Sequence, residues 1–162
     1  MNEPLAWRRM SEVGTNDGRK RGRWLAEIFA REVAGHVPDA ELVMVSDGNV
    51  GIEGVRCLGR VSLERLIELY AAAWVFCMPS TYEGFGVPYI EAMAAGTPVV
   101  ATDNPGARDV LGGGAYGLLP SDAELGATLR ELLLDAELRE SFAERGRTRA
   151  LPSDHRHDAR SR

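Results

Sequence analysis

Short apolar runs alternate with amphipathic stretches along the chain. These runs are largely continuous in hydrophobicity, a pattern typical of parallel strands that are covered on both faces. We therefore expect strands at 40–48, 54–61, 73–80, 97–103 and 115–120.

The stretches between these strands place apolar residues at helical spacing, as at Leu63, Leu66, Ile67 and Tyr70. Helix start signals accompany several of them, because serine and aspartate are favourable N-caps and proline suits the first turn. These signals are Ser62, Pro88, Asp135 and a capping box at residues 121–124. Regular alternation of strand and helix predicts an α/β domain with a parallel sheet and helices on both faces.

A length of 162 residues is most simply one domain, which we place at residues 12–150. Residues 12–17, with the sequence EVGTND, could close a first strand, but residues 7–12, with the sequence WRRMSE, are too polar for a buried one. Residues 151–162 have almost nothing to bury. We therefore expect both ends, 1–11 and 151–162, to be poorly structured.

The composition argues against two classes of partner. A net charge of -5 disfavours a general role at nucleic acids or membrane surfaces. No apolar run approaches the roughly 18 residues of a transmembrane segment, and the first residues do not resemble a signal peptide. Cys57 and Cys77 lie in separate apolar runs, which is typical of free buried thiols. These features predict a protein of the reducing cytoplasm.

One strand-to-helix junction has the features of a ligand site. Parallel α/β sheets bind ligands at the carboxyl ends of their strands. The expected strand at 73–80 is followed by a loop with two glycines and then by a helix. The start of a helix carries a partial positive charge and outward-pointing amides, which suit a phosphate. The amides at this position belong to Gly84, Phe85, Gly86 and Val87.

Glu83 and Glu91 lie on either side of this helix start. Helical side chains lean toward the N-terminus, so both carboxylates could reach the start of this helix. Carboxylates repel phosphate but accept strong hydrogen bonds from sugar hydroxyls. Together the amides and acids suit a nucleotide-sugar. In the alternative interpretation, Glu83 only stabilises the helix start and Glu91 is an exposed helix residue.

Residues 79–111, PSTYEGFGVPYIEAMAAGTPVVATDNPGARDVL, closely resemble the donor-binding domain of family 4 retaining glycosyltransferases. The resemblance extends from about Glu12 to Arg149. It implies one Rossmann-like domain, the C-terminal half of the two-domain GT-B fold. It further implies that Glu83 contacts the transferred sugar, that the amides following it bind sugar hydroxyls and phosphate, and that Glu91 holds the ribose diol.

The resemblance also assigns a cation to the diphosphate. The lysine of the family falls on Lys20, the only lysine of this chain, and its arginine falls on Thr15, which is neutral. Arg19, Arg21 or Arg23 could substitute for that arginine. Alternatively, residues 19–23 are a solvated basic patch.

Two other motifs are rejected. Residues 112–117 match the GxGxxG fingerprint, but they follow a helical pattern and precede a strand pattern, the reverse of a dinucleotide site. Residues 154–158, DHRHD, have possible metal spacing but lie in a polar tail. No Asp-x-Asp pair follows a strand. We expect neither a metal nor another cofactor, and we expect a nucleoside-diphosphate-sugar as substrate.

The implied activity is sugar transfer with retention of configuration, in carbohydrate biosynthesis, with Glu83 and Lys20 as catalytic residues and Thr15 in the donor site. The acceptor would bind to an N-terminal domain or subunit that is missing from this chain, which would then be a truncated or frame-shifted gene product or a subunit that needs a partner. Alternatives are a non-catalytic nucleotide-sugar-binding module or an inactive truncated remnant. A sugar-nucleotide epimerase of the same fold is disfavoured by the pattern at 79–111.

Overall fold

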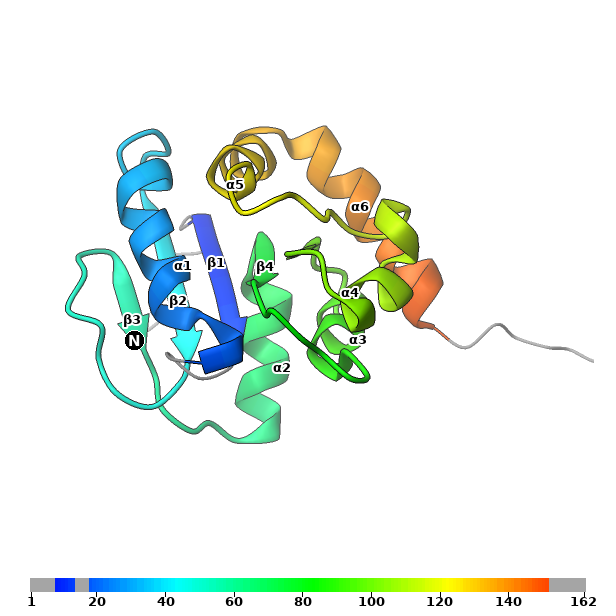
Figure 1. Cartoon of the computed structure of the whole chain (residues 1–162), viewed down its shortest axis with the longest axis horizontal. Helices are drawn as coiled ribbons and strands as arrows, with labels where there is room; N and C mark the ends of the chain where they lie inside the picture. The colour runs from blue at the N-terminus through cyan, green and yellow to red at the C-terminus, as the bar shows by residue number, and fades with distance from the viewer. Residues whose placement is uncertain (1–7, 14–17, 152–162) are drawn as a thin grey trace, which may run out of the picture.

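The computed structural model describes the backbone of residues 8–13 and the backbone and side chains of residues 18–151. Its strands form one sheet in the order β3-β2-β1-β4-β5, and every pair of neighbours is parallel (Figure 1). This confirms the expected parallel α/β architecture. The strands are β1 (Arg8–Val13), β2 (Ala40–Val45), β3 (Val55–Cys57), β4 (Val75–Met78) and β5 (Val99–Ala101).

The polar segment near the N-terminus forms the central strand. β1 pairs with β2 along its whole length and with β4 at Met10 and Ser11. The expectation of a poorly structured N-terminal end was therefore wrong for residues 8–11, and β1 begins before the expected domain start at Glu12. A ladder is made by backbone N–H and C=O groups, which polar residues supply as well as apolar ones. The rest of the expected unstructured ends, 1–7 and 152–162, lies outside the described residues.

The expected strand at 115–120 is reduced to a single bridge between Val100 and Leu118. Leu118 N donates to the carbonyl oxygen of Val99 over 2.9 Å, and Ala101 N donates to that of Leu118 over 3.0 Å. The ladder cannot continue, because Tyr116 N already donates to Leu111 O and Pro120 has no N–H.

Helix caps form largely where the sequence indicates them. Ser62 Oγ accepts from Arg65 N over 3.1 Å, and Asp135 Oδ1 accepts from Leu138 N over 3.0 Å. The helices are α1 (Gly22–Ile28), which continues as the π-helix η2 (Phe29–Val33), α2 (Leu63–Ala72), α3 (Val87–Ala94), α4 (Pro105–Val110), α5 (Leu125–Leu134) and α6 (Ala136–Ala150), with 3-10 turns η1 (Gly18–Lys20) and η3 (Gly112–Gly114).

The capping box at 121–124 forms only in part. Glu124 accepts from Ser121 N and from Ser121 Oγ, over 3.0 and 2.8 Å. The serine hydroxyl therefore donates to the glutamate instead of accepting from a helix amide. A turn at residues 122–124 separates Ser121 from the start of α5 at Leu125, which explains why the serine does not cap the helix.

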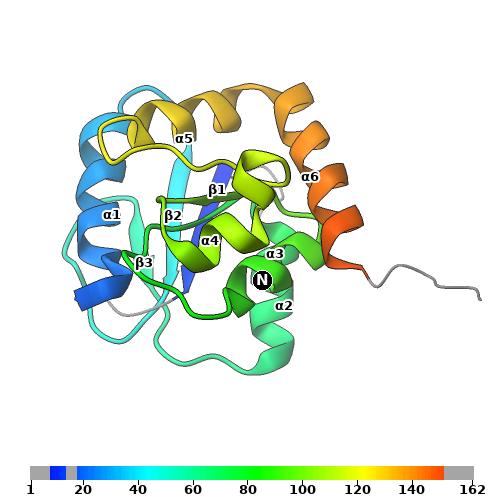
Figure 2. The same ribbon diagram turned by 45° about the vertical axis from the view of Figure 1, so that its right-hand side comes forward.

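Alternate residues of β4 divide the core between the two faces of the sheet. Val75 and Cys77 pack with α1, η2 and α5, whereas Phe76 and Met78 pack with α2, α3 and α4. The helix α6 runs along the edge of the molecule beside α3 (Figures 1 and 2). Cys57 and Cys77 are free thiols, as expected, but only Cys77 is buried. Within the described ranges, no helix has the length and apolar character needed to cross a membrane.

Candidate functional site

The junction between β4 and α3 presents backbone amides at the carboxyl edge of the sheet. Gly86 is the N-cap of α3 and has a left-handed backbone with φ 63°. A Cβ at this position would lie 2.9 Å from side-chain atoms of both Tyr89 and Val110, so the tight turn requires glycine. Within residues 18–151, no acceptor is bound to the amides of Gly84, Phe85, Gly86 and Val87.

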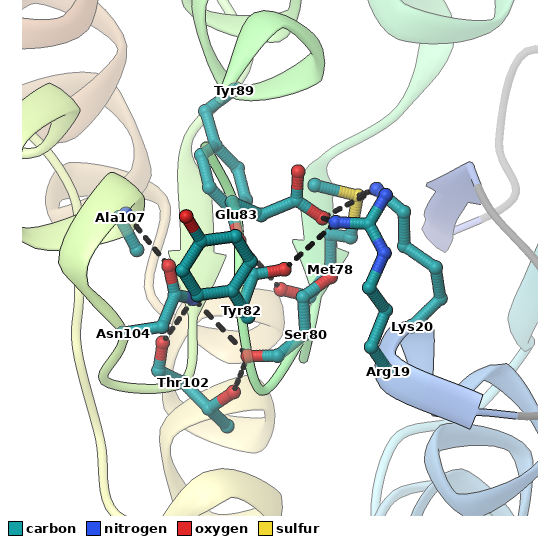
Figure 3. A network of polar contacts seen from close by, with 10 residues as sticks. All are labelled: Arg19, Lys20, Met78, Ser80, Tyr82, Glu83, Tyr89, Thr102, Asn104 and Ala107. Carbon is teal, nitrogen blue, oxygen red and sulfur yellow. Dashed lines mark hydrogen bonds and ion pairs between the residues drawn. The ribbon is translucent and has the colours of Figure 1, made fainter. Parts of the chain in front are cut away.

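Buried polar side chains hold the loop before this junction from the β5 side. Thr102 Oγ1 and Asn104 Nδ2 both donate to the carbonyl oxygen of Ser80, over 3.0 and 3.1 Å (Figure 3). Asn104 Oδ1 also accepts from Ala107 N over 3.0 Å and caps α4. One asparagine therefore fixes both the loop after β4 and the start of α4.

The loop before α1 is joined to the same region from the other side. Thr81 N donates to the carbonyl oxygen of Arg19 over 2.8 Å. Arg21 Nε donates to the carbonyl oxygen of Pro79 over 2.7 Å. These contacts place Lys20, which lies between the two arginines, beside the loop that carries Glu83.

Lys20 and Glu83 form an ion pair between Nζ and Oε1. Their side chains are only 15% and 7% exposed, so the pair is largely removed from water. Lys20 Nζ also lies 3.6 Å from Met78 Sδ. On the far side, a Cβ at Gly106 would come within 2.8 Å of the carbonyl carbon of Glu83. The backbone of Glu83 thus fits directly against α4.

Tyr89 lies near Glu83, and its Oη donates to the carbonyl oxygen of Met78 over 3.2 Å. Burial raises the pKa of the Tyr89 phenol far above its usual range, and the nearby charge of Glu83 adds to this shift. Tyr89 therefore remains a neutral hydrogen-bond donor that supports the end of β4.

Glu91 has a separate environment between α2 and α3. Tyr70 Oη donates to Glu91 Oε2 over 3.0 Å. The apolar stripe expected on α2 lines a groove here, in which Tyr70 is buried whereas Leu63 and Ile67 are exposed. The groove has a volume of about 330 Å³ and is lined by Leu63, Leu66, Ile67, Tyr70, Glu91, Ala94 and Ala95.

The structure thus brings together Lys20, Glu83 and the open amides at the start of α3. Glu91 meets Tyr70 at the groove, and Thr15 lies outside the described residues. Sequence reasoning missed Tyr70 as the partner of Glu91 and Gly106 as the neighbour of Glu83. For Asn104 a signal existed, because asparagine before a proline is a common helix start.

Only one of the two rejected motifs lies in the described part of the chain. The glycines of residues 112–114 form η3 between α4 and the Val100–Leu118 bridge, so they do not connect a strand to a helix. No group of three or more His, Cys, Asp or Glu side chains suited to a metal occurs in the described part of the chain. The segment 154–158 lies outside it.

Comparison with known proteins identifies the family of this chain. Residues 33–149 match the profile of "Glycosyl transferases group 1". A phosphatidyl-myo-inositol mannosyltransferase of Mycolicibacterium smegmatis is 32% identical over 96% of this chain and 42% of its own length. The O-antigen chain mannosyltransferase B of Escherichia coli is 40% identical over 59% of this chain and 26% of its own length. The chain therefore spans less than half of either relative.

Solved structures agree in fold. The sucrose-phosphate synthase of Thermosynechococcus elongatus is 29% identical, with a TM-score of 0.78 over 91% of this chain and 41% of its own. The C-terminal domain of a group 1 glycosyl transferase from Francisella tularensis, at 20% identity, has a TM-score of 0.76 over 87% of this chain and 83% of that domain. The chain belongs to the group 1 glycosyl transferase family and has the Rossmann-like α/β fold of one half of a GT-B enzyme.

Proposed function

We propose that this chain is the C-terminal, donor-binding half of a family 4 retaining glycosyltransferase, and that a nucleoside-diphosphate-sugar binds at the start of α3. The observation that carries the proposal is the Lys20–Glu83 ion pair beside backbone amides that have no acceptor in the described chain. Amides at a helix start and a lysine suit phosphate, and a carboxylate suits sugar hydroxyls. Family membership supports this chemistry.

In this proposal each residue has a distinct role. The amides of residues 84–87 bind the diphosphate and sugar hydroxyls, and Glu83 accepts from the transferred sugar. Glu91 accepts from the ribose diol, and the apolar groove beside it offers a surface for the base. Thr15 contributes an uncharged contact near the diphosphate.

The proposed reaction exchanges one bond at the anomeric carbon for another on the same face of the sugar. The bond from this carbon to the diphosphate oxygen breaks, and the oxygen of an acceptor hydroxyl bonds to the carbon. The hydroxyl proton passes to the departing diphosphate oxygen. Lys20 stabilises the negative charge that builds on the leaving group, which is where electrostatic catalysis contributes most. The proposal includes no metal or other cofactor.

Transfer also needs an acceptor site, which we assign to an N-terminal domain outside this chain. The chain spans 42% of the mycobacterial relative and 41% of the sucrose-phosphate synthase, which leaves room for such a domain in those proteins. The same finding supports a second candidate, in which this chain by itself is a nucleotide-sugar-binding module without activity.

A thermal-shift titration with UDP, GDP and ADP tests donor binding. At about 100 times the dissociation constant, the bound nucleotide should stabilise the chain by roughly 2.7 kcal/mol. Lys20→Ala and Glu91→Ala should reduce this shift, whereas Arg31→Ala, at an exposed pair with Glu32, should not. A folded chain that none of the nucleotides stabilises would contradict the proposal.

A transfer assay separates binding from activity. Several curated relatives are named mannosyltransferases, so mannose is the first donor sugar to test. The isolated chain should bind donor without measurable transfer. Robust transfer by this chain alone would show that the required acceptor domain was wrongly inferred.

A further inference from the structure

Three consecutive basic residues before α1 have three different environments. Arg21 is fully engaged: besides Pro79 O, its guanidinium donates to Thr102 Oγ1 over 3.1 Å and to both carboxylate oxygens of Asp122 over 2.8 and 2.9 Å. It also lies 4.1 Å above the ring of Trp24. Arg21 therefore has a structural role and has little capacity left for a ligand.

Arg19 differs from both of its neighbours. Its side chain is 54% exposed, whereas that of Lys20 is 15% exposed. Arg19 Nη1 donates to the carbonyl oxygen of Tyr82 over 3.1 Å and lies 4.0 Å from Glu83 Oε1. Figure 3 shows Arg19 and Lys20 reaching toward Glu83 from the same side. The guanidinium is thus fixed at the entrance of the site with one side open to solvent.

The balance of charge at this entrance favours an anion. One carboxylate, Glu83, faces two cations, Lys20 and Arg19, and the nearby start of α3 adds a partial positive charge. A guanidinium has five N–H donors, and the described contacts of Arg19 use one of them. The remaining fork matches two oxygens of one phosphoryl group, a geometry that the ammonium of Lys20 does not offer.

We infer that Arg19 is a second phosphate-binding residue, and that it gives the site its preference for a diphosphate over a monophosphate. Lys20 binds one phosphoryl group at the buried end, and Arg19 binds the other at the exposed end. This inference rests on the proposed function. Of the arginines that could substitute for the family's arginine, Arg21 is bound to Asp122, whereas Arg19 lies next to Glu83.

Isothermal titration calorimetry of the diphosphate and monophosphate of uridine, guanosine and adenosine tests the inference. For the base that binds wild type, Arg19→Ala should weaken diphosphate binding by about ten- to hundredfold, the usual value of a hydrogen bond to a charged group. Monophosphate binding should change much less, so the dissociation constant of the monophosphate divided by that of the diphosphate should fall. Arg19→Lys should lie in between, and Arg31→Ala should match wild type.

The outcomes separate the inference from the function on which it rests. Wild type that binds no nucleotide would overturn the proposed function and this inference with it. If wild type binds a diphosphate and Arg19→Ala binds it equally well, only the role of Arg19 is overturned. The same holds if Arg19→Ala loses affinity for the diphosphate and for the monophosphate by the same factor. If Arg19→Ala fails to fold, Arg19→Gln, which keeps a donor for the carbonyl of Tyr82, is judged by the same ratio.

Discussion

Glu83 and Glu91 lie on either side of the start of α3, yet their environments differ sharply. Glu83 is almost fully buried and is paired with the ammonium of Lys20. Glu91 is half-buried and accepts a hydrogen bond from the neutral phenol of Tyr70 at the edge of a groove. Glutamate thus forms a buried ion pair at position 83 and accepts a hydrogen bond at the edge of a groove at position 91.

This difference predicts unequal consequences of mutation. Removing one partner of a buried ion pair leaves an uncompensated charge, which commonly costs several kcal/mol. Removing a neutral donor at a partly hydrated rim costs less, because water can replace it. The stability of the fold should therefore depend more on Lys20 and Glu83 than on Tyr70 and Glu91, although both carboxylates are proposed to bind the donor.

The largest effect is expected from Lys20→Ala. It leaves the Glu83 carboxylate buried without its cation, so the free energy of unfolding should fall by about 2–4 kcal/mol. Urea denaturation measures this loss, and Arg31→Ala, at an exposed pair, should cost less than about 1 kcal/mol. Adding Glu83→Gln to Lys20→Ala should recover part of the loss. A Lys20→Ala loss no larger than that of Arg31→Ala would contradict the importance of the pair.

Gly106→Ala should come next, because the new Cβ would collide with the backbone of Glu83. Overpacking of this kind typically costs about 1–3 kcal/mol. Glu83 is proposed to bind the transferred sugar, which a free nucleoside diphosphate lacks. Displacement of Glu83 should therefore weaken binding of the nucleotide-sugar more than binding of the nucleoside diphosphate. The matched control is Gly35→Ala, where nothing lies within 4 Å of the added Cβ. Equal denaturation midpoints for the two variants would rule out tight packing at Gly106.

Tyr70→Phe tests the rim of the groove. It removes the hydroxyl that donates to Glu91 and should lower the free energy of unfolding by about 1 kcal/mol. Because Glu91 then loses its fixed orientation, nucleoside diphosphate affinity should also fall severalfold. Tyr116→Phe, whose ring stays against Arg149, is the control for loss of a phenol. If calorimetry finds full affinity in Tyr70→Phe, the orientation of Glu91 does not depend on Tyr70.

The smallest effect concerns Asp122, the exposed partner of Arg21. Its hydrogen bond with Arg21 lowers the pKa of the Asp122 carboxyl below its usual range. A lowered folded-state pKa stabilises the fold above the unfolded value, and this contribution disappears as pH falls through the folded value. Asp122→Asn should therefore cost less than about 1 kcal/mol at neutral pH, and the difference from wild type should vanish in acid. A difference that is independent of pH would exclude the charge as its cause.

The sequence predicted the strands and helices whose apolar pattern matches the residues that the fold buries. β2, β4 and β5 lie within expected strands, and Leu125, Leu129, Leu132 and Leu133 of α5 are buried as a stripe. The central strand β1 could not be found in this way, because backbone pairing gives it its place without an apolar pattern. The stripe on α2 was found, but which of its residues the fold buries depends on how α3 packs beside it.

The sequence indicated the individual residues of the site but not which of them contact one another. The glycine loop and the two glutamates follow from local sequence, whereas Lys20 is 63 residues from Glu83 and reaches it only because β1 and β4 are neighbours. Resemblance to a family supplied Lys20 as a candidate, and periodicity could not have done so. The separate environment of Glu91 depends on Tyr70 from another helix, which no local pattern indicates.

Because Lys20 is the only lysine of the chain, its ammonium can be followed directly. Reductive methylation with ¹³C-formaldehyde labels this side chain and the N-terminal amine, and the amine serves as an internal reference. Titration with the nucleoside diphosphate that gives the largest thermal shift should move the Lys20 signal saturably, with the dissociation constant measured by calorimetry. A Lys20 signal that stays unchanged while the nucleotide saturates the protein would show that the phosphates bind elsewhere, and would contradict the proposed donor site.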